Sequence, residues 1–180
     1  DQLLLAEGAP EFLCAEVSVE RIRALWASAT GRDDALWAQL AGLGLTGLLV
    51  PEAHGGLGLG DADFVAIAEA CGYVALPEPL VDTALIAAAL LRDAGNETLA
   101  ATWLPRIAEG TARIAVAHPV NPLVADAHVA DLLLLTRGDA IHAVPRAAVS
   151  LTANEGLDPS RRLFRVDWEP ADGTVLASGD

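Results

Sequence analysis

The sequence predicts an α+β fold, in which an all-α N-terminal domain precedes a small antiparallel β-domain. Apolar residues recur every three or four positions up to about residue 110, which is the period of amphipathic helices. From about residue 112 they alternate with other residues, which is the period of strands. Gly110 separates the two patterns, and glycine commonly ends helices. We therefore expect a helical domain over residues 1–111 and a β-domain over residues 112–180.

An amphipathic helix is expected over residues 19–29. Ile22, Leu25 and Trp26 have the i, i+3, i+4 spacing of one buried helical face, so the tryptophan is expected in the core. Gly31 follows and favours the end of this helix.

A second helix is expected soon afterwards. Asp33 or Asp34 can cap it, because a carboxylate there accepts hydrogen bonds from the unpaired N–H groups of the first turn. Gly42 and Gly44 favour its end. Its expected buried face comprises Leu36, Trp37, Leu40 and Leu43.

A loop rich in glycine follows a possible strand over residues 47–50. Glycines before a helix can let a dinucleotide pyrophosphate approach the backbone. Here Pro51, Glu52, Ala53 and His54 separate the possible strand from the glycines, the full G-x-G-x-x-G pattern is missing, and no βα alternation follows. We therefore favour a structural loop over a Rossmann nucleotide site.

The remaining helical part begins with a helix that Asp61 is expected to cap, with Phe64, Ile67 and Cys71 on its buried face. Residues 80–92 are apolar nearly all round, which is typical of a helix surrounded by other helices. The last helix is expected to start at a cap on Asn96 and to bury Trp103.

The β-domain is predicted from three short segments. Residues 113–117 have the apolar pattern of a strand, and residues 163–168 alternate apolar and polar residues. Residues 132–135 and 140–144 flank Thr136-Arg137-Gly138-Asp139, which is typical of a hairpin turn.

Composition excludes several function classes. Of the 180 residues, 53% are hydrophobic, which is enough for a core and argues against disorder. The formal net charge of −14 disfavours nucleic-acid partners and anionic membrane surfaces. The longest apolar run, Ala84–Leu91, is far shorter than the roughly 20 residues that span a bilayer. Cys14 and Cys71 are expected to be free buried thiols, and we expect a cytoplasmic protein.

Titratable residues form no complete site in the sequence. The histidines lack the i, i+4 spacing of a helical metal site, and Cys-x-x-Cys is missing, so no metal site is expected. Glu52 and Glu69 are possible general bases, although a loop-anchoring carboxylate and a solvated helix face are simpler interpretations. The four histidines are His54, His118, His128 and His142.

The chain resembles the acyl-CoA dehydrogenase family over nearly its whole length. Leu36–Leu45 is similar to the family's tryptophan-led helix with a Leu-Gly-Leu end, and Val50–Gly58 is similar to its Val-Pro-Glu and Gly-Gly-x-Gly loop. Trp103–Gly110 is similar to the last helix before the family's β-domain. Two later segments resemble β-domain landmarks, Ala130–Leu133 and Asp158–Arg162.

The resemblance implies a three-domain flavoenzyme that uses FAD to dehydrogenate an acyl-CoA thioester between its α and β carbons. It also implies an electron-transfer flavoprotein as electron acceptor and a homo- or hetero-oligomer. The family's catalytic base lies in a C-terminal four-helix domain that is outside these residues, so we assign no catalytic residue here and expect this segment alone to be inactive.

The resemblance places the flavin-contacting positions at Ala117, His118 and Ala125. The family's Thr-Glu-Pro element falls on Ala117-His118-Pro119, and its Trp-Ile-Thr-like strand falls on Leu123-Val124-Ala125. Two hydroxyl donors of the family are thereby replaced by alanine. This leaves two hypotheses: part of an FAD-dependent acyl-CoA dehydrogenase, or a non-catalytic partner subunit of a heteromeric one, for example one that acts on steroid side-chain CoA esters.

Overall fold

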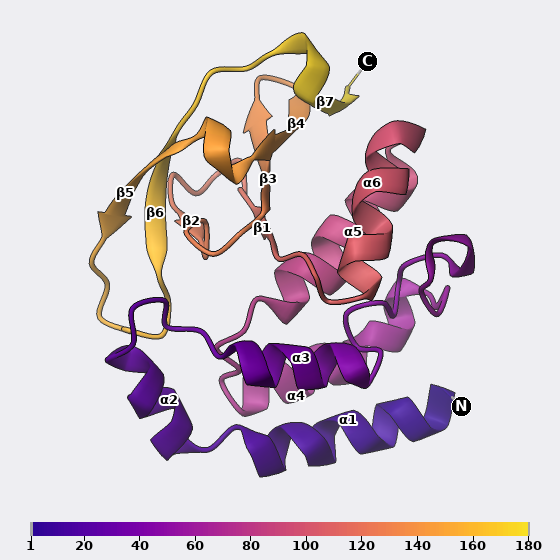
Figure 1. Ribbon diagram of the computed structural model, residues 1–180, viewed down its shortest axis with the longest axis vertical. Coiled ribbons are helices and arrows are strands. Elements are labelled where there is room, and N and C mark those ends of the chain that lie inside the picture. The colour runs from indigo at the N-terminus through magenta and orange to yellow at the C-terminus, as the bar shows by residue number, and fades with distance from the viewer. Residues whose placement is uncertain (1, 180) are drawn as a thin grey trace.

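The computed structural model describes the backbone of residues 2–179 and the side chains of residues 8–179. Helices occupy the lower and right-hand parts of Figure 1, and strands occupy the upper left. The main helices are α1 (Gln2–Glu16), α2 (Val19–Trp26), α3 (Asp34–Gly42), α4 (Val65–Tyr73), the π-helix η3 (Val81–Ala87), α5 (Ala88–Asp93) and α6 (Glu97–Ala108). Short 3₁₀ turns are η1 (Glu52–His54), η2 (Asp61–Phe64), η4 (Arg146–Ala148) and η5 (Asp172–Thr174).

The strands form two sheets, in the orders β1-β3-β4-β7 and β2-β6-β5. They are β1 (Ile114–Val116), β2 (Val124–Ala125), β3 (Leu132–Arg137), β4 (Ala140–Pro145), β5 (Ser150–Asn154), β6 (Leu163–Asp167) and β7 (Val175–Ser178). The α+β class and the β3–β4 hairpin are confirmed. The expectation of purely antiparallel pairing is wrong at one place, because β1 and β3 are parallel. The chain leaves the first sheet to form β2 in the second sheet, and so returns to β3 in its original direction.

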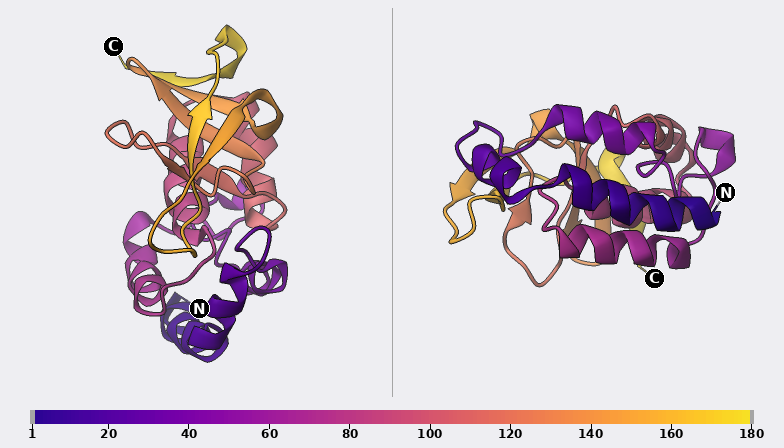
Figure 2. Two further views of the ribbon diagram at one scale, coloured as in Figure 1. Left: turned by 90° about the vertical axis from the view of Figure 1, so that its left-hand side faces the viewer. Right: turned by 90° about the horizontal axis from the view of Figure 1, so that it is seen from below.

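Strand β3 is buried on both faces. Leu132 and Leu134 belong to the core that the helices share with the first sheet. Leu133 and Leu135 belong to a second core between the two sheets. Alternate side chains point to opposite faces of a strand, so four consecutive leucines are needed to fill both cores. In Figure 1, strands β5 and β6, strands β3 and β4, and helices α5 and α6 follow one another from left to right, and the left view of Figure 2 looks along this direction with β5 and β6 toward the viewer.

Helix η3 is fixed to the edge of the first sheet by Thr83. Its buried hydroxyl donates to the carbonyl of Ile114 at 3.2 Å and accepts from the Ile114 N–H at 3.0 Å. An edge strand exposes unpaired backbone groups, and this side chain pairs those of β1. The contact therefore sets the position of η3 against the sheet.

Capping follows the sequence at two of three expected positions. Asp33 caps α3 by accepting from two backbone N–H groups, and Asn96 caps α6 by accepting from the Leu99 N–H. The expected cap on Asp61 is wrong, because the first turn begins one residue earlier. The Asp63 carboxylate instead accepts from the Gly60 N–H at 2.9 Å.

Four of the expectations about buried residues and strands are wrong. Trp26 is 41% exposed and Cys14 is exposed, because α1 and α2 lie at the periphery, where α2 buries only Leu25 among its residues. Leu43 is 43% exposed, because α3 ends at Gly42 and leaves Leu43 at the cap instead of on the buried helical face. Residues 47–50 form buried turns in place of a strand. Cys71 is buried as expected, and burial raises the pKa of its thiol to about 11.

Trp37 is buried as expected, and its indole N–H donates to the Gly110 carbonyl at 2.8 Å. Trp103 is partly buried against the helical core, with the Arg106 guanidinium 4.5 Å from its ring. Among the residues that the structure describes, no helix has the length and apolarity needed to cross a bilayer.

The glycine-rich loop folds back on the turns that precede it. A side-chain carbon at Gly56 would lie 2.0 Å from the Val50 carbonyl oxygen and 2.4 Å from the Val50 Cβ. The turn η1 precedes the glycines, and η2 and α4 follow them, with no parallel βα unit beside this loop in the described residues. Its glycines therefore permit close backbone packing, as the structural interpretation expects.

Replacing Gly56 by alanine should destabilise the fold by about 1–3 kcal/mol, because the backbone must shift to admit the methyl group. Urea unfolding of the purified chain measures this change. Gly72→Ala is the matched control, because a Cβ there meets nothing within 4 Å on helix α4. Equal unfolding midpoints for the two variants would contradict the packing role of Gly56.

Candidate functional site

The three residues predicted from the resemblance converge on one cavity of about 430 Å³. Ala117 and His118 follow β1, whereas Ala125 is the last residue of β2. Ala117 is half-buried beside the sheet, and His118 is exposed at the cavity mouth. The cavity lies between these strand ends and the helix formed by η3 and α5.

One helical face forms the wall opposite the strands. Asp82, Ile86 and Leu90 line the cavity at intervals of four residues. Successive fourth residues lie on the same side of a helix, so one stripe faces the space. The expectation that residues 80–92 are surrounded by other helices is therefore wrong on this face, where Ile86 is 38% exposed. Residues of the first sheet complete the apolar part of the wall, namely Val116, Leu134 and Ile141.

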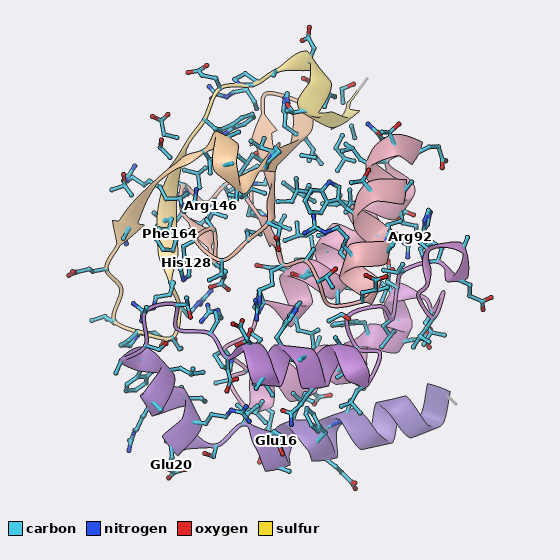
Figure 3. All side chains as sticks on the ribbon, in the orientation of Figure 1. Glu16, Glu20, Arg92, His128, Arg146 and Phe164 are labelled. Atoms are coloured by element: carbon cyan, nitrogen blue, oxygen red, sulfur yellow. The ribbon has the colours of Figure 1, made fainter. Side chains whose placement is uncertain are left out.

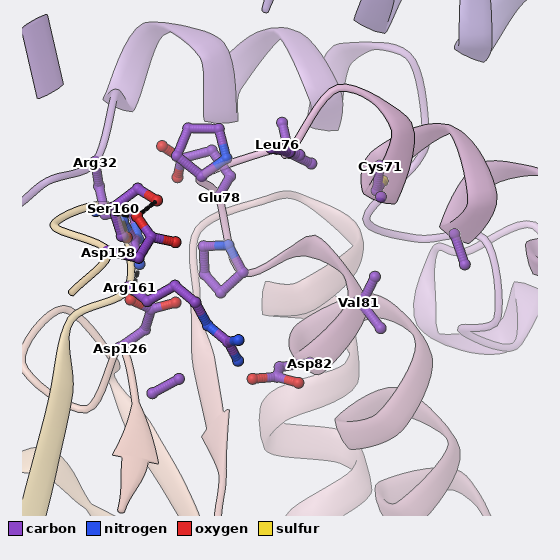
Figure 4. Close-up of a pocket in the computed structure, with 16 residues that line it drawn as sticks. Arg32, Cys71, Leu76, Glu78, Val81, Asp82, Asp126, Asp158, Ser160 and Arg161 are labelled. Carbon is purple, nitrogen blue, oxygen red and sulfur yellow. Dashed lines mark hydrogen bonds and ion pairs between the residues drawn. The ribbon is translucent and has the colours of Figure 1, made fainter. Parts of the chain in front are cut away.

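A second cavity of about 440 Å³ adjoins the first (Figure 4). Asp82, Ala125 and Arg161 line both cavities and so form the wall between them. The polar residues that line the second cavity alone include Arg32, Glu78, Asp126, Asp158 and Ser160.

The far wall of the second cavity is a buried charge network. Arg32 and Asp126 form an ion pair with side-chain exposures of 3% and 10%. Arg32 also donates to the carbonyls of Gly31 and Ser160, at 2.6 and 2.9 Å. These bonds connect the segment before α3 to both strands β2 and β6, because Asp126 follows β2 and Ser160 precedes β6.

Asp126 is held in a left-handed backbone conformation, with a φ of 58°. Non-glycine residues rarely adopt this conformation, although aspartate tolerates it better than most. Its N–H donates to the Arg162 carbonyl at 2.9 Å. Burial raises the pKa of the Asp126 carboxyl, and the Arg32 guanidinium opposes that shift.

Glu78 closes the network on the helical side. Its carboxylate accepts from the Asp33 N–H at 2.6 Å and lies 3.5 Å from Arg113. Burial raises the pKa of the Glu78 carboxyl, while the Asp33 N–H and the two nearby arginines oppose the shift. Arg113 also pairs with Asp34 at 2.9 Å.

A second connection between the helical and β parts lies at His128. Its Nε2 lies 2.8 Å from the Thr30 carbonyl, so this nitrogen carries the proton and donates. The ring stacks on Phe164 with a centroid distance of 4.8 Å. Figure 3 shows His128, Phe164 and Arg146 together on the strand side. Burial lowers the pKa of the His128 imidazole, and the hydrogen bond to the Thr30 carbonyl opposes this shift.

The structure also places the other titratable residues singled out in the sequence. Glu52 and Glu69 are exposed, and neither lines the two cavities. His142 is buried, with Nδ1 2.9 Å from the Thr174 hydroxyl. Within residues 8–179, no group of three or more His, Cys, Asp or Glu side chains has a geometry that could hold a metal ion.

Comparison with known proteins identifies the family. Residues 1–111 match the family model described as "Acyl-CoA dehydrogenase, N-terminal domain". The chain belongs to the acyl-CoA dehydrogenase family. Over 175 residues it is 32% identical to acyl-CoA dehydrogenase IpdE2 of Mycobacterium tuberculosis, which corresponds to 94% of this chain and 52% of that protein. The chain therefore spans about half the length of this relative.

Solved structures of acyl-CoA dehydrogenases share the fold. The ChsE4–ChsE5 complex from Mycobacterium tuberculosis contains a chain that matches with a TM-score of 0.85 at 20% identity, over 98% of this chain and 57% of that one. A Tcur3481–Tcur3483 steroid ACAD variant matches with a TM-score of 0.79 at 23% identity, over 97% and 55%. The helices and the strands of this acyl-CoA dehydrogenase chain are therefore arranged as in these two structures.

The sequence analysis of this acyl-CoA dehydrogenase segment did not predict the charged residues that line the second cavity. One of them, Asp82, could have been noticed. Asp82 is an acidic residue inside the otherwise apolar run of residues 80–92. Burial, and secondarily the negative charge of Asp126, raise its pKa to about 6, while Arg161 opposes this shift. Arg32 and Asp126 carried no comparable signal, because each is ordinary in its local sequence, and Arg161 stood out only as part of the family-like segment Asp158–Arg162.

Replacing Arg32 by methionine should cost about 3–5 kcal/mol of unfolding free energy, because it leaves the Asp126 carboxylate buried without its partner. The double variant Arg32→Met with Asp126→Asn should recover a large part of this loss, since both charges are gone and asparagine tolerates the left-handed backbone at position 126. Denaturant unfolding of the wild type, the two single variants and the double variant at pH 7 tests this prediction. A double variant as unstable as the sum of both single variants would contradict it.

Asp82→Asn should stabilise the fold at pH 7 by on the order of 2 kcal/mol, because the folded protein then buries no charge at this position. The raised folded pKa means that the contribution of Asp82 to stability is fully present below its unfolded pKa and is lost as pH rises through about 6. The advantage of the variant should therefore shrink between pH 7 and pH 4. Thermal melts of both proteins across this range test the sign, and a constant advantage would contradict it.

Proposed function

We propose that this chain is the N-terminal part of an FAD-dependent acyl-CoA dehydrogenase, which introduces a double bond between the α and β carbons of an acyl-CoA thioester. The observation that supports this most directly is the convergence of Ala117, His118 and Ala125 on one cavity beside an apolar helical face. The division into a helical domain over residues 1–111 and a β-domain over residues 112–180 is part of this proposal.

The residues around the cavity fit a flavin ring. Ala117 and Ala125 leave space where larger side chains would fill it, and Leu163 adds an apolar surface. Asn121 and Thr136 supply polar groups within the same lining. Bound FAD would supply the hydride acceptor of the reaction. The chain's own residues would hold the ring and keep water from the apolar part of the cavity.

The rest of the proposal concerns the whole protein. The relatives are about twice as long as this chain, and we expect the catalytic base in the part beyond it. We also propose an electron-transfer flavoprotein as the electron acceptor. Cys14 and Cys71 are both free, which fits a reducing cytoplasm.

A second candidate is a non-catalytic partner subunit of a heteromeric acyl-CoA dehydrogenase, for example one that acts on steroid CoA esters. Alanine at positions 117 and 125 provides no side-chain hydroxyl to a flavin, which favours this candidate. One similar solved structure is described as a complex of two chains, and another as a steroid enzyme. Both candidates predict an oligomer.

Flavin content separates the two candidates. The full-length gene product is purified alone and after co-expression with the neighbouring dehydrogenase gene, and visible absorbance gives the flavin bound per chain. Yellow protein from the single gene supports the first candidate. Flavin and acyl-CoA oxidation that arise only on co-expression support the second, and colourless protein in both preparations counts against both.

Ala125→Trp should lower the bound flavin by at least about tenfold in whichever preparation is yellow, because an indole and the ring would compete for one volume. Ala101→Trp, on the exposed side of α6, is the matched control and should keep its colour. Normal flavin content in the Ala125 variant would place the cofactor elsewhere.

A further inference from the structure

Asp82 is a carboxylate that faces a cavity without a protein partner. Within residues 8–179, no side chain or backbone N–H lies at hydrogen-bond or ion-pair distance from it, and the residue is half-buried. It lines both cavities and is therefore open to a ligand in either. A half-buried carboxylate that no protein donor satisfies is available to a ligand that carries a hydrogen-bond donor.

Arg161 approaches Asp82 from the opposite side. Figure 4 shows the Arg161 guanidinium, which comes from the segment before β6, directed toward the Asp82 carboxylate on η3. The two groups interact through their charges but do not form an ion pair. A hydrogen-bond acceptor and a donor thus face the same space, at the wall that Ala125 shares.

The pair stands between the cavity proposed for the flavin and the second cavity. Leu76, Pro79 and Val81 give the second cavity an apolar lining next to the pair, so an acyl group there would meet Asp82 and Arg161 beside the flavin. Asp82 is the second residue of η3, a π-helix of seven residues. Helices of this type are frequent at functional sites. A first-turn aspartate could favour the helix from an exposed position, so helix stabilisation does not require this burial.

We propose that Asp82 and Arg161 form a specificity subsite for a hydroxyl group on the acyl part of a CoA thioester. A hydroxyl donates one hydrogen bond and accepts others, so it satisfies the carboxylate and the guanidinium together. A plain alkyl chain would leave both groups without partners in a partly dehydrated space, which is the situation that gives a site strong discrimination. This inference rests on the proposed acyl-CoA dehydrogenase function and names its substrate class.

The test measures binding and oxidation with matched thioesters. The full-length protein, with its flavin and any subunit that co-purifies, is titrated calorimetrically with octanoyl-CoA and with 5-, 6-, 7- and 8-hydroxyoctanoyl-CoA. At least one hydroxylated thioester should bind more tightly than octanoyl-CoA by about 10-fold or more, as hydrogen bonds to charged groups allow. The ratio of kcat/KM values should favour the same compound.

Asp82→Leu should abolish this preference, which is measured as the ratio of the dissociation constants of octanoyl-CoA and the preferred hydroxyoctanoyl-CoA, so that any general effect of the variant on binding cancels. Glu69→Gln removes an exposed carboxylate on α4 that lines neither cavity, and it should keep the preference. Circular dichroism confirms that both variants are folded.

The possible outcomes separate this inference from the function on which it rests. Oxidation of octanoyl-CoA with no preference for any hydroxylated thioester, or a preference that survives in Asp82→Leu, overturns the subsite and leaves the proposed function in place. A complete failure to bind every thioester overturns both.

Discussion

The buried ion pair between Arg32 and Asp126 is the constraint on which the arrangement of the two cavities depends. It joins the segment before α3 to the end of β2, and the bond from Arg32 to the Ser160 carbonyl extends it to the start of β6. Removing both charges from water is expensive, so such a pair is weak evidence for stability. Its clearest consequence is geometric, because Asp126 directly follows Ala125 and thus fixes the wall that both cavities share.

The helices and the sheets are connected by packing as well as by charge. The first sheet shares one core with the helices through Leu132 and Leu134, and a second core with the other sheet through Leu133 and Leu135. Thr83 pairs the backbone of β1 and thereby sets the position of η3. The residue beside it is Asp82, so the same contact that closes the sheet edge directs the neighbouring carboxylate toward the cavities.

Local physics made a large part of this fold predictable from the sequence. Periodicity located α2, α3 and the β3–β4 hairpin, and capping chemistry located Asp33 and Asn96. The failures concern relations between distant segments. The parallel pairing of β1 with β3 depends on a strand placed in another sheet, and the exposure of Trp26 depends on where α2 lies in the whole molecule. No local pattern carries either kind of information.

The candidate site likewise contains residues that could be predicted from the sequence and residues that could not. Resemblance to a family located Ala117, His118 and Ala125, whereas Asp82 and Arg161 are 79 positions apart and meet only in the folded chain. The charges around these two residues also determine which end of an acyl-CoA thioester the second cavity can accept.

Four carboxyl groups and two guanidinium groups line the second cavity, namely those of Glu78, Asp82, Asp126, Asp158, Arg32 and Arg161. The low effective dielectric of a cavity strengthens the repulsion between these carboxyl groups and a phosphate. A neutral hydroxyl carries no net charge, so the carboxyl groups do not repel it in this way. The thioester's uncharged acyl end is therefore the part that this wall can accept, and the phosphates of CoA are better placed away from it.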